Sequence, residues 1–316
     1  MGDIVLTSPV LRCLRKQLPD AEIHFLTKEP FAPLVSGNPN IDRVHFLKGS
    51  LGSTIAALRK EGYDFVVDLH HNYRTFRIRH ALHCRSGVYP KEDLRRRLMT
   101  IFKGLKPRYP HVVDRYFKAV EKLGVANDGQ GLDYFPIPEN MADIQPQEPY
   151  AVVSCGAQYG TKRIPLRKVF YFCCQIHDYP VVLLGDNADR KRYKSSNAKF
   201  HKNVKNLCGK TSINQSALLV KNAAFVLTPD TGLMHIASAF NRPTAVMWGS
   251  SVPQFGFAPY KNTSAFSSQV NAGCRPCSRL GRDRCPLGHF RCMEEHDWWR
   301  IAGIANNKLK QQESNS

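Results

Sequence analysis

The chain has 316 residues, of which 42% are hydrophobic and 22% charged, a balance typical of a globular protein. This length is sufficient for two domains with sizeable cores. No stretch approaches the roughly twenty apolar residues of a membrane span, and the first residues lack a signal-peptide layout, so we expect a cytoplasmic protein. The net charge of +19 favours polyanionic partners, namely nucleic acid, an anionic membrane surface or phosphorylated small molecules.

The first residues read as a loop that leads into a helix. Ser8 is a favourable N-cap and Pro9 suits the first helical position, so Gly2 and Asp3 lie in the preceding loop. A doubly wound sheet usually has a strand before such a loop, and none precedes this one. We therefore expect the leading strand of the first sheet to be absent, because the start codon is placed late or the sequence is a fragment.

Short β-rich runs alternate with helical patterns in both halves of the chain. The first half has four such runs, at residues 21–27, 43–47, 65–69 and 85–89. The second half has five, at residues 150–154, 180–185, 204–207, 224–228 and 244–249. This alternation predicts an α/β fold with a doubly wound parallel sheet in each half. The Gly- and Pro-rich residues 127–149 read as the linker, and we place the domains at residues 1–145 and 146–316.

Polar segments follow four of these runs, at the edge of a sheet where ligands of open α/β folds bind. They are residues 68–74, 154–163, 185–192 and 229–235. In the last of them, Asp230 or Thr231 is expected to cap a helix that starts near Gly232. The first N–H groups of that helix would attract an anion. The alternative is a helix cap that binds no ligand.

Four of the ten cysteines lie close together near the C-terminus, namely Cys274, Cys277, Cys285 and Cys292. A Cys-x-x-Cys pair followed by two more cysteines is compatible with a tetrahedral zinc site. The second pair is spaced more widely than in a zinc ribbon. Reduced thiols or local disulfides are therefore the alternatives.

Four segments, residues 1–23, 160–165, 228–249 and 274–293, together resemble those of one known family. It is the ADP-heptose:lipopolysaccharide heptosyltransferases, glycosyltransferase family 9, and the similarity runs over essentially the whole chain. The resemblance implies a GT-B fold, in which an acceptor-binding and a nucleotide-sugar-binding Rossmann-like domain face a cleft. It also implies inverting transfer of heptose from ADP-heptose to an inner-core sugar of lipopolysaccharide.

The resemblance also implies roles for individual residues. Asp3, in the Gly-Asp motif, matches the proposed general base. Lys162, with Thr161 in the Thr-Lys motif, matches the lysine that contacts the phosphates of the donor. The motif that holds the sugar nucleotide corresponds to Asp230, Thr231, Gly232 and His235. For His235 both a phosphate contact and simple packing remain open.

The sequence contains no Asp-x-Asp motif of the kind that metal-dependent transferases use. We therefore expect metal-independent transfer without a cofactor, in which Lys162 and the N–H groups near Thr231 stabilise the departing diphosphate. A carboxylate such as Asp3 would activate the acceptor hydroxyl as a general base.

On the acceptor side the candidates are His70, Asn72 and Arg74, whose basic character suits a carboxylated or phosphorylated sugar. Ordinary surface polarity is the alternative. A second basic group lies on a segment that reads as an amphipathic helix, at Arg95, Arg96, Arg97 and Lys103. This segment would suit peripheral contact with the anionic cytoplasmic face of the inner membrane.

Two other classes of protein compete with the transferase interpretation. A basic nucleic-acid-binding protein would account for the charge, and its affinity would fall steeply with salt. A nucleotide-sugar epimerase of similar fold would turn over its substrate without an acceptor. Under the transferase interpretation we expect ADP-heptose and a lipopolysaccharide core precursor as partners, and no nucleic acid.

Overall fold

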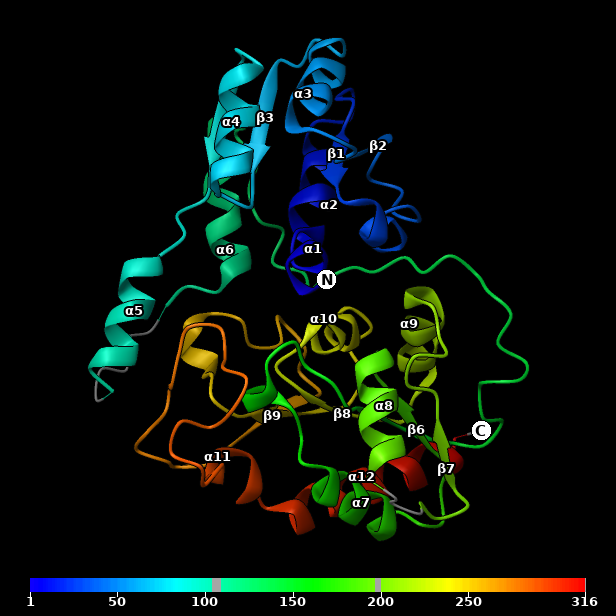
Figure 1. Cartoon of the computed structure of the whole chain (residues 1–316). Coiled ribbons are helices and arrows are strands. Elements are labelled where there is room, and N and C mark those ends of the chain that lie inside the picture. The colour runs from blue at the N-terminus through cyan, green and yellow to red at the C-terminus, as the bar shows by residue number, and fades with distance from the viewer. Residues whose placement is uncertain (104–108, 197–199, 316) are drawn as a thin grey trace. The chain divides into compact units, whose positions relative to one another are not determined.

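The computed structural model describes residues 1–103, 109–196 and 200–315 (Figure 1). These residues divide into two compact units. The first unit comprises Met1, Asp3–Asp93 and Pro110–Ile137. The second unit comprises Gly2, Leu94–Tyr109 and Pro138–Ser316. Among the described residues, no helix is both long and apolar enough to cross a bilayer.

The second unit is built on a six-stranded parallel sheet with the order β10-β9-β8-β5-β6-β7. Its strands are β5 (Ala151–Ser154), β6 (Val181–Leu184), β7 (Val204–Asn206), β8 (Phe225–Pro229), β9 (Thr244–Trp248) and β10 (Ala265–Gln269). The chain builds the sheet outward from β5 to β7, then returns to β8 on the other side of β5. The strand order therefore reverses between β5 and β8.

Helices cover both faces of this sheet. Those of the second unit are α5 (Asp93–Ile101, whose first residue belongs to the first unit), α7 (Leu166–Gln175), α8 (Asn187–Ser195), α9 (Ile213–Asn222), α10 (Gly232–Ala239), α11 (Arg291–Glu294) and α12 (Trp298–Glu313). Figure 1 shows α7 and α12 on one face and α9 and α10 on the other. This is the doubly wound layering that the alternating sequence pattern predicts.

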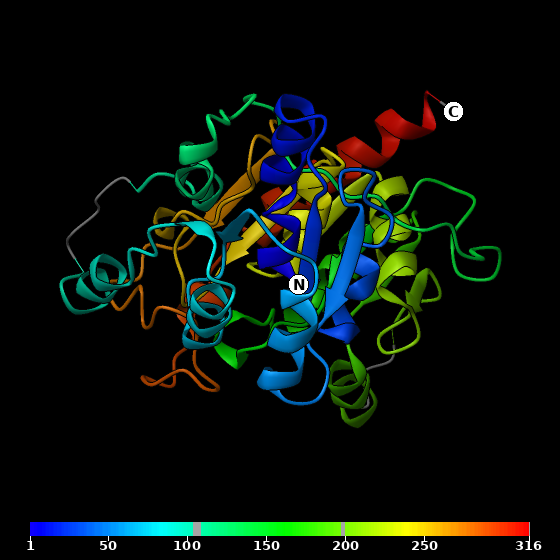
Figure 2. The same cartoon turned by 90° about the horizontal axis from the view of Figure 1, so that it is seen from above.

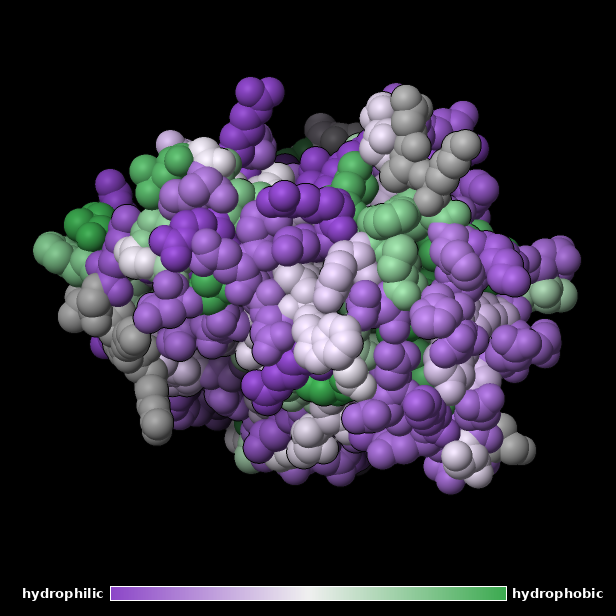
Figure 3. Space-filling model, turned by 90° about the horizontal axis from the view of Figure 1, so that it is seen from below, coloured by the Kyte–Doolittle hydropathy of each residue, from purple (hydrophilic) through white to green (hydrophobic). Residues whose placement is uncertain are grey.

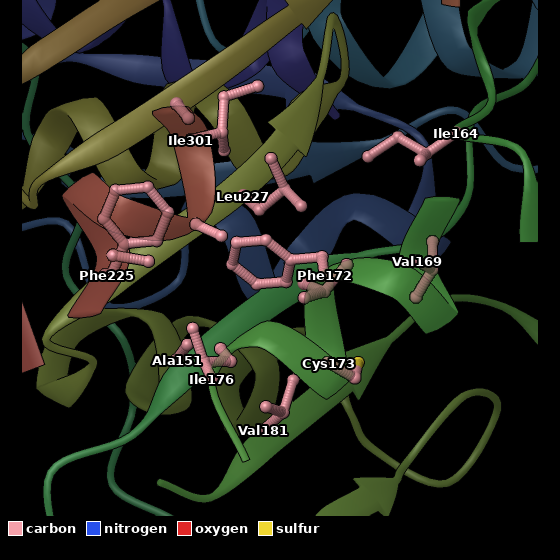
Figure 4. Close-up of a cluster of buried hydrophobic side chains, with 14 of the residues drawn as sticks. Ala151, Ile164, Val169, Phe172, Cys173, Ile176, Val181, Phe225, Leu227 and Ile301 are labelled. Atoms are coloured by element: carbon pink, nitrogen blue, oxygen red, sulfur yellow. The ribbon is translucent and has the colours of Figure 1, made fainter. Parts of the chain in front are cut away.

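The main core lies between the sheet and the layer of α7 and α12. Alternate strand residues such as Phe225 and Leu227 point to this layer and pack against Phe172 of α7, as Figure 4 shows. The Phe172 and Phe225 rings lie 6.3 Å apart and both are fully buried. Burial of one such side chain contributes about 1.5–3 kcal/mol to the free energy of folding.

The surface seen from below in Figure 3 is mostly hydrophilic, as expected for a face that meets water.

The first unit contains two separate parallel strand pairs instead of one sheet. Its strands are β1 (His24–Thr27) with β2 (Arg43–Phe46), and β3 (Phe65–Asp68) with β4 (Arg85–Val88). Its helices are α1 (Gly2–Val5, whose first residue belongs to the second unit), α2 (Ser8–Gln17), α3 (Leu51–Arg59), α4 (Tyr73–Ala81) and α6 (Val112–Tyr116). The sequence predicted one doubly wound sheet here without its leading strand, whereas the four described strands pair as two ribbons.

A buried arginine ties α2 to the residues that leave the first unit. Arg12, which is 7% exposed, donates from Nε and Nη2 to both oxygens of Asp128 at 2.9 Å and also contacts Asp133. The hydrogen bonds from Arg12 hold the pKa of Asp128 well below its usual range. Residues 127–149, which include Asp128 and Asp133, contain no helix or strand and run as an open green loop in Figures 1 and 2.

Local details differ from the sequence-based expectations. Gly2 and Asp3 lie in a one-turn helix and not in a loop, and Thr7, not Ser8, holds the N-cap position of α2. The ninth predicted strand is followed by a further strand, β10, which the sequence reasoning missed. Its residues Ala265–Gln269 include polar serines because β10 is an edge strand, in which Ser267 and Gln269 are exposed.

Candidate functional site

The loops after β5, β8 and β9 meet at one edge of the sheet in the second unit. Lys162 ends a short 3-10 helix after β5, Asp230 follows β8, and Ser251 follows β9. These three strands are direct neighbours in the sheet, and all run parallel. The strand order reverses between β5 and β8, so Lys162 and Asp230 lie where open α/β sheets bind their ligands.

An ion pair joins two of these loops. Lys162 Nζ lies 2.6 Å from Asp230 Oδ2, and Ser251 Oγ donates to the same oxygen at 2.7 Å. The side chains of Lys162 and Asp230 are 16% and 13% exposed, so the pair is largely shielded from water. A lysine ammonium has three N–H donors, and Asp230 takes one of them. The others are available to an anionic ligand, while Asp230 fixes the position of the charge.

The N-terminus of α10 adjoins this ion pair. Thr231 is the N-cap residue in extended conformation, and its side chain makes no capping hydrogen bond. Its hydroxyl instead lies 3.2 Å from the hydroxyl of Thr228. The first N–H groups of the helix, from Gly232 onward, are therefore not covered by a side-chain cap. Such N–H groups, aided by the helix dipole, bind anions.

Two other predicted donor-site residues are buried. Thr161 is 2% exposed, and its hydroxyl donates to Arg282 O and accepts from Arg282 N, at 2.9 and 2.8 Å. It also lies 2.9 Å from the hydroxyl of Ser250. His235, in α10, is 4% exposed. The hydrogen bonds of Thr161 hold the loop that carries Lys162 against residues 274–293, the cysteine-rich segment.

The preceding glycine allows this close approach. A Cβ atom on Gly160 would lie 2.0 Å from the carbonyl oxygen of Asp283, a distance at which real atoms overlap. Only glycine permits the two backbones to pack here without a shift. The cysteine-rich segment therefore acts as a scaffold for the loop that carries Lys162.

Arg275, which the sequence reasoning did not single out, holds the loop after β9. Its guanidinium donates to the carbonyls of Gly249, Val270 and Ser251 at 2.7, 2.7 and 2.8 Å. The residue is 9% exposed, and burial lowers the pKa of Arg275 below its usual value. Because Ser251 contacts Asp230, Arg275 positions one wall of the site without facing a ligand itself. Sequence spacing offered no signal for this role.

The four clustered cysteines carry free thiols. Burial raises the pKa of Cys292 to about 12 and also raises that of Cys277, which favours the neutral thiol. Within the described ranges, three metal-ligating side chains with all ligand atoms within 4.8 Å of one another occur only at His24, His45 and Glu61. The cysteine metal site therefore stays a prediction.

In the first unit, the candidate acceptor residues follow β3. Asp68, buried at the end of this strand, accepts from the N–H groups of His70 and His71 at 3.1 and 2.7 Å. Asn72 caps α4 and lies 3.1 Å from the ring of His70. Sequence reasoning missed Asp68, although an acidic residue at the last position of an apolar strand is a usable signal. Asp3 is exposed in α1.

Arg74 lies at a hollow of about 450 Å³ in the same unit. The hollow is also lined by Lys28, after β1, and by Ser50, which caps α3. These residues come from the carboxyl ends of strands and the N-termini of helices, so the hollow combines two cationic side chains with a helix dipole. Glu29 also lines the hollow and partly offsets this charge.

Comparison with solved structures identifies the fold. The structure resembles a glycosyl transferase family 9 protein from Veillonella parvula DSM 2008, with a TM-score of 0.75 and 21% identity over 98% of this chain and 95% of that one. It resembles Escherichia coli ADP-heptose lps heptosyltransferase II with a TM-score of 0.74 and 21% identity, covering 99% and 96% of the two chains. These similarities show the GT-B fold of glycosyltransferases, as the sequence predicted.

Sequence comparison identifies the family. The chain is 24% identical to lipopolysaccharide heptosyltransferase 2 of Escherichia coli K12 over 81% of this chain and 82% of that one. It is 25% identical to lipooligosaccharide heptosyltransferase 2 of Campylobacter jejuni serotype O:2 over 98% and 96%. The profile of glycosyltransferase family 9 (heptosyltransferase) matches residues 52–285. The chain therefore belongs to glycosyltransferase family 9, which confirms the resemblance seen in the sequence.

Replacement of Arg275 by Gln is predicted to destabilise the fold by about 2–4 kcal/mol, because three buried carbonyls lose charge-assisted donors. Urea unfolding measures the loss, and titration with ADP should show weaker binding because the loop of Ser251 is released. Arg284→Gln, at an exposed position in the same segment, is the matched control. Equal stability of the two variants would contradict the positioning role of Arg275.

Proposed function

We propose that the protein transfers heptose from ADP-heptose to an acceptor sugar of the lipopolysaccharide inner core, with inversion at the anomeric carbon. The observation that carries this proposal is the Lys162–Asp230 pair beside the N-terminus of α10, at the point where the strand order reverses. Family membership supports the glycosyl transfer, and the names of the relatives support heptose and lipopolysaccharide.

In this proposal the second unit binds the donor. The diphosphate lies against the N–H groups of Thr231 and Gly232 and the ammonium of Lys162, which together supply fixed positive charge. Asp230 uses Oδ2 for Lys162 and Ser251, and offers its other oxygen to a hydroxyl of the sugar. Thr161 and His235, both buried, support this loop and this helix from behind.

In this proposal the transfer is a single displacement at the anomeric carbon. The acceptor hydroxyl attacks the anomeric carbon from the face opposite the diphosphate, its oxygen forms the new bond, and ADP leaves with the electron pair of the broken bond. Asp3 accepts the proton of the hydroxyl as a general base, which is worth roughly a hundredfold to ten-thousandfold in rate. Lys162 and the α10 N–H groups stabilise the leaving diphosphate, so the reaction needs no metal ion.

Two substitutions should separate the chemical step from donor binding. Asp3→Asn is expected to lower the transfer rate by roughly a hundredfold or more while ADP binds as before. Lys162→Ala is expected to weaken ADP binding by about tenfold or more, because a charged donor to phosphate is lost. Transfer assays and ADP calorimetry measure these effects, with Asp20→Asn and Lys194→Ala as exposed controls. Full turnover by Asp3→Asn, or unchanged ADP affinity in Lys162→Ala, would refute the corresponding role.

We further propose that the hollow beside Arg74 receives the anionic group of the acceptor. Arg74 and Lys28 are the cationic side chains that line it, and the N-terminus of α3 adds its dipole. A carboxylated or phosphorylated sugar supplies the complementary charge. His70 and Asn72, which interact with each other beside the start of α4, would limit the shape of this acceptor site.

Arg74→Ala is expected to raise the KM for the acceptor about fivefold to tenfold, while kcat and the affinity for ADP stay near those of the wild type. Arg77→Ala is the matched control, because Arg77 is exposed on the same helix and does not line the hollow. Steady-state kinetics with varied acceptor measures both variants. An identical acceptor KM for the two would count against the hollow.

We also propose that the outer face of α5 makes peripheral contact with the cytoplasmic face of an anionic membrane. Leu94 and Ile101 are 71% and 60% exposed, and Leu98 lies between them at the spacing of one helix face. Arg95, Arg97 and Lys103 are exposed nearby. Arg96 corrects the sequence interpretation, because it is buried with its guanidinium 5.4 Å from the centre of the Phe257 ring. The contact of Arg96 with Phe257 holds α5 in the second unit. The apolar face of α5 that carries Leu94 and Ile101 stays exposed to solvent.

Replacement of Leu94 and Ile101 by Ser is expected to lower binding to anionic vesicles at least tenfold, since two apolar side chains no longer insert. Co-sedimentation with vesicles containing an anionic phospholipid measures the effect, and raised salt should weaken the wild type as well. Leu287→Ser, at another exposed leucine, is the control. If all three proteins sediment alike, α5 is not the membrane contact.

A further inference from the structure

A polar cluster in the first unit contains none of the residues of the proposed donor and acceptor sites. It brings together His24 at the start of β1, His45 in β2 and Glu61, which follows α3. Nitrogen atoms of the two histidines and a carboxylate oxygen of Glu61 lie within 4.8 Å of one another. The side chains are 7%, 17% and 23% exposed, respectively. Three metal-ligating side chains are thus largely shielded from water and have their ligand atoms close together, although they are far apart in the sequence.

The hydrogen bonds of His24 assign the roles of its two ring nitrogens. Nε2 lies 2.8 Å from the carboxylate of Glu22, so it carries the proton and donates it. Nδ1 is then the acceptor, and it faces Tyr63 Oη at 2.8 Å and His45 Nε2 at 3.1 Å. One lone pair on Nδ1 is therefore approached by two groups.

This arrangement has the form of a metal site with its supporting partners. Histidines that bind metals commonly donate their other ring N–H to a carboxylate, as His24 does to Glu22. Glu61 is oriented in the same way, because Arg43 donates to its Oε2 at 2.8 Å and leaves Oε1 toward His45.

The distances suit a zinc ion of tetrahedral geometry. Ligands at 2.0–2.1 Å from zinc lie about 3.3 Å from each other. His24 Nδ1 and His45 Nε2 are 3.1 Å apart, and His45 Nε2 lies 3.8 Å from Glu61 Oε1. Changes of about half an ångström or less bring these two pairs to the ideal separation, and the third pair, His24 and Glu61, lies within 4.8 Å. Tyr63 Oη or a water molecule would supply the fourth ligand.

We propose that His24, His45 and Glu61 form a binding site for a divalent transition-metal ion, of which zinc is the best match. A set of two imidazoles and one carboxylate binds zinc in preference to magnesium or calcium. The ion joins β1 and β2 to the segment between α3 and β3, and so stabilises the first unit. The site does not depend on the proposed function, because none of its residues belongs to the donor or acceptor sites.

The test is metal titration of the full chain at neutral pH, with Zn²⁺ for stoichiometry and affinity and Co²⁺ as a spectroscopic probe. Wild type is expected to bind one equivalent of Co²⁺ with d–d bands and without thiolate charge transfer, which separates this site from the four cysteines. His45→Ala should lose that equivalent. Glu22→Gln, which changes an exposed carboxylate outside the ligand set, should weaken Zn²⁺ binding by about tenfold to a hundredfold.

His201→Ala, at an exposed histidine of the second unit, should bind as the wild type does. Zn²⁺ should also raise the Tm of wild type more than that of His45→Ala, and should leave the affinity for ADP unchanged. The proposal is overturned if wild type binds no Co²⁺ through nitrogen and oxygen ligands, or if His45→Ala and Glu22→Gln bind as tightly as wild type. Failure of ADP binding would bear on the proposed function alone.

Discussion

The ion pair between Lys162 and Asp230 is the interaction around which the second unit is arranged. It joins loops that leave neighbouring strands at the point where the strand order reverses, and it places a cation beside the N-terminus of α10. Such a charge stabilises a bound anion most when it is held in place before the ligand arrives. Moving the side chain during binding would cost part of the electrostatic stabilisation. Asp230 provides this restraint from one side and Ser251 secures Asp230 from the other.

The cysteine-rich segment explains how these loops keep their positions. Thr161 and Gly160 pack directly on the backbone of residues 282 and 283, while Arg275 donates to the carbonyls on either side of Ser250. A buried guanidinium that donates to several carbonyls is costly to desolvate but strongly directional. The same short segment therefore supports both the loop that carries Lys162 and the loop that carries Ser251. This role needs neither a metal ion nor a disulfide at the cysteines.

Much of the fold could be predicted from the sequence, because apolar β-rich runs such as those of β5, β6 and β8 are buried on both sides and leave an unambiguous pattern. The edge strand β10 escaped prediction since its alternate residues face water. In the site, Asp230 follows a strand at the start of a helix, so local sequence was sufficient to propose it, whereas Lys162 was proposed from the resemblance to the family. Their contact with each other was not predicted, because it depends on which strands are neighbours.

Other contacts could not be predicted for the same reason. Arg275 reaches Gly249 across 26 positions, and the cluster of His24, His45 and Glu61 joins two strands and the turn after α3. A single sequence carries no information on such pairings unless the residues fall into a motif. Burial of Arg96 was also hidden, since a run of three arginines reads as one exposed surface until the packing of α5 on Phe257 is known.

The most direct test of the account is calorimetric titration of the wild-type protein with ADP, UDP and a short single-stranded oligonucleotide, at low and at raised salt. The account predicts selective binding of ADP that changes little with salt, because the shielded Lys162 and the α10 N–H groups hold the diphosphate. Binding of the oligonucleotide alone, with an affinity that falls steeply as salt rises, would contradict it and make the charge of +19 the main determinant of function.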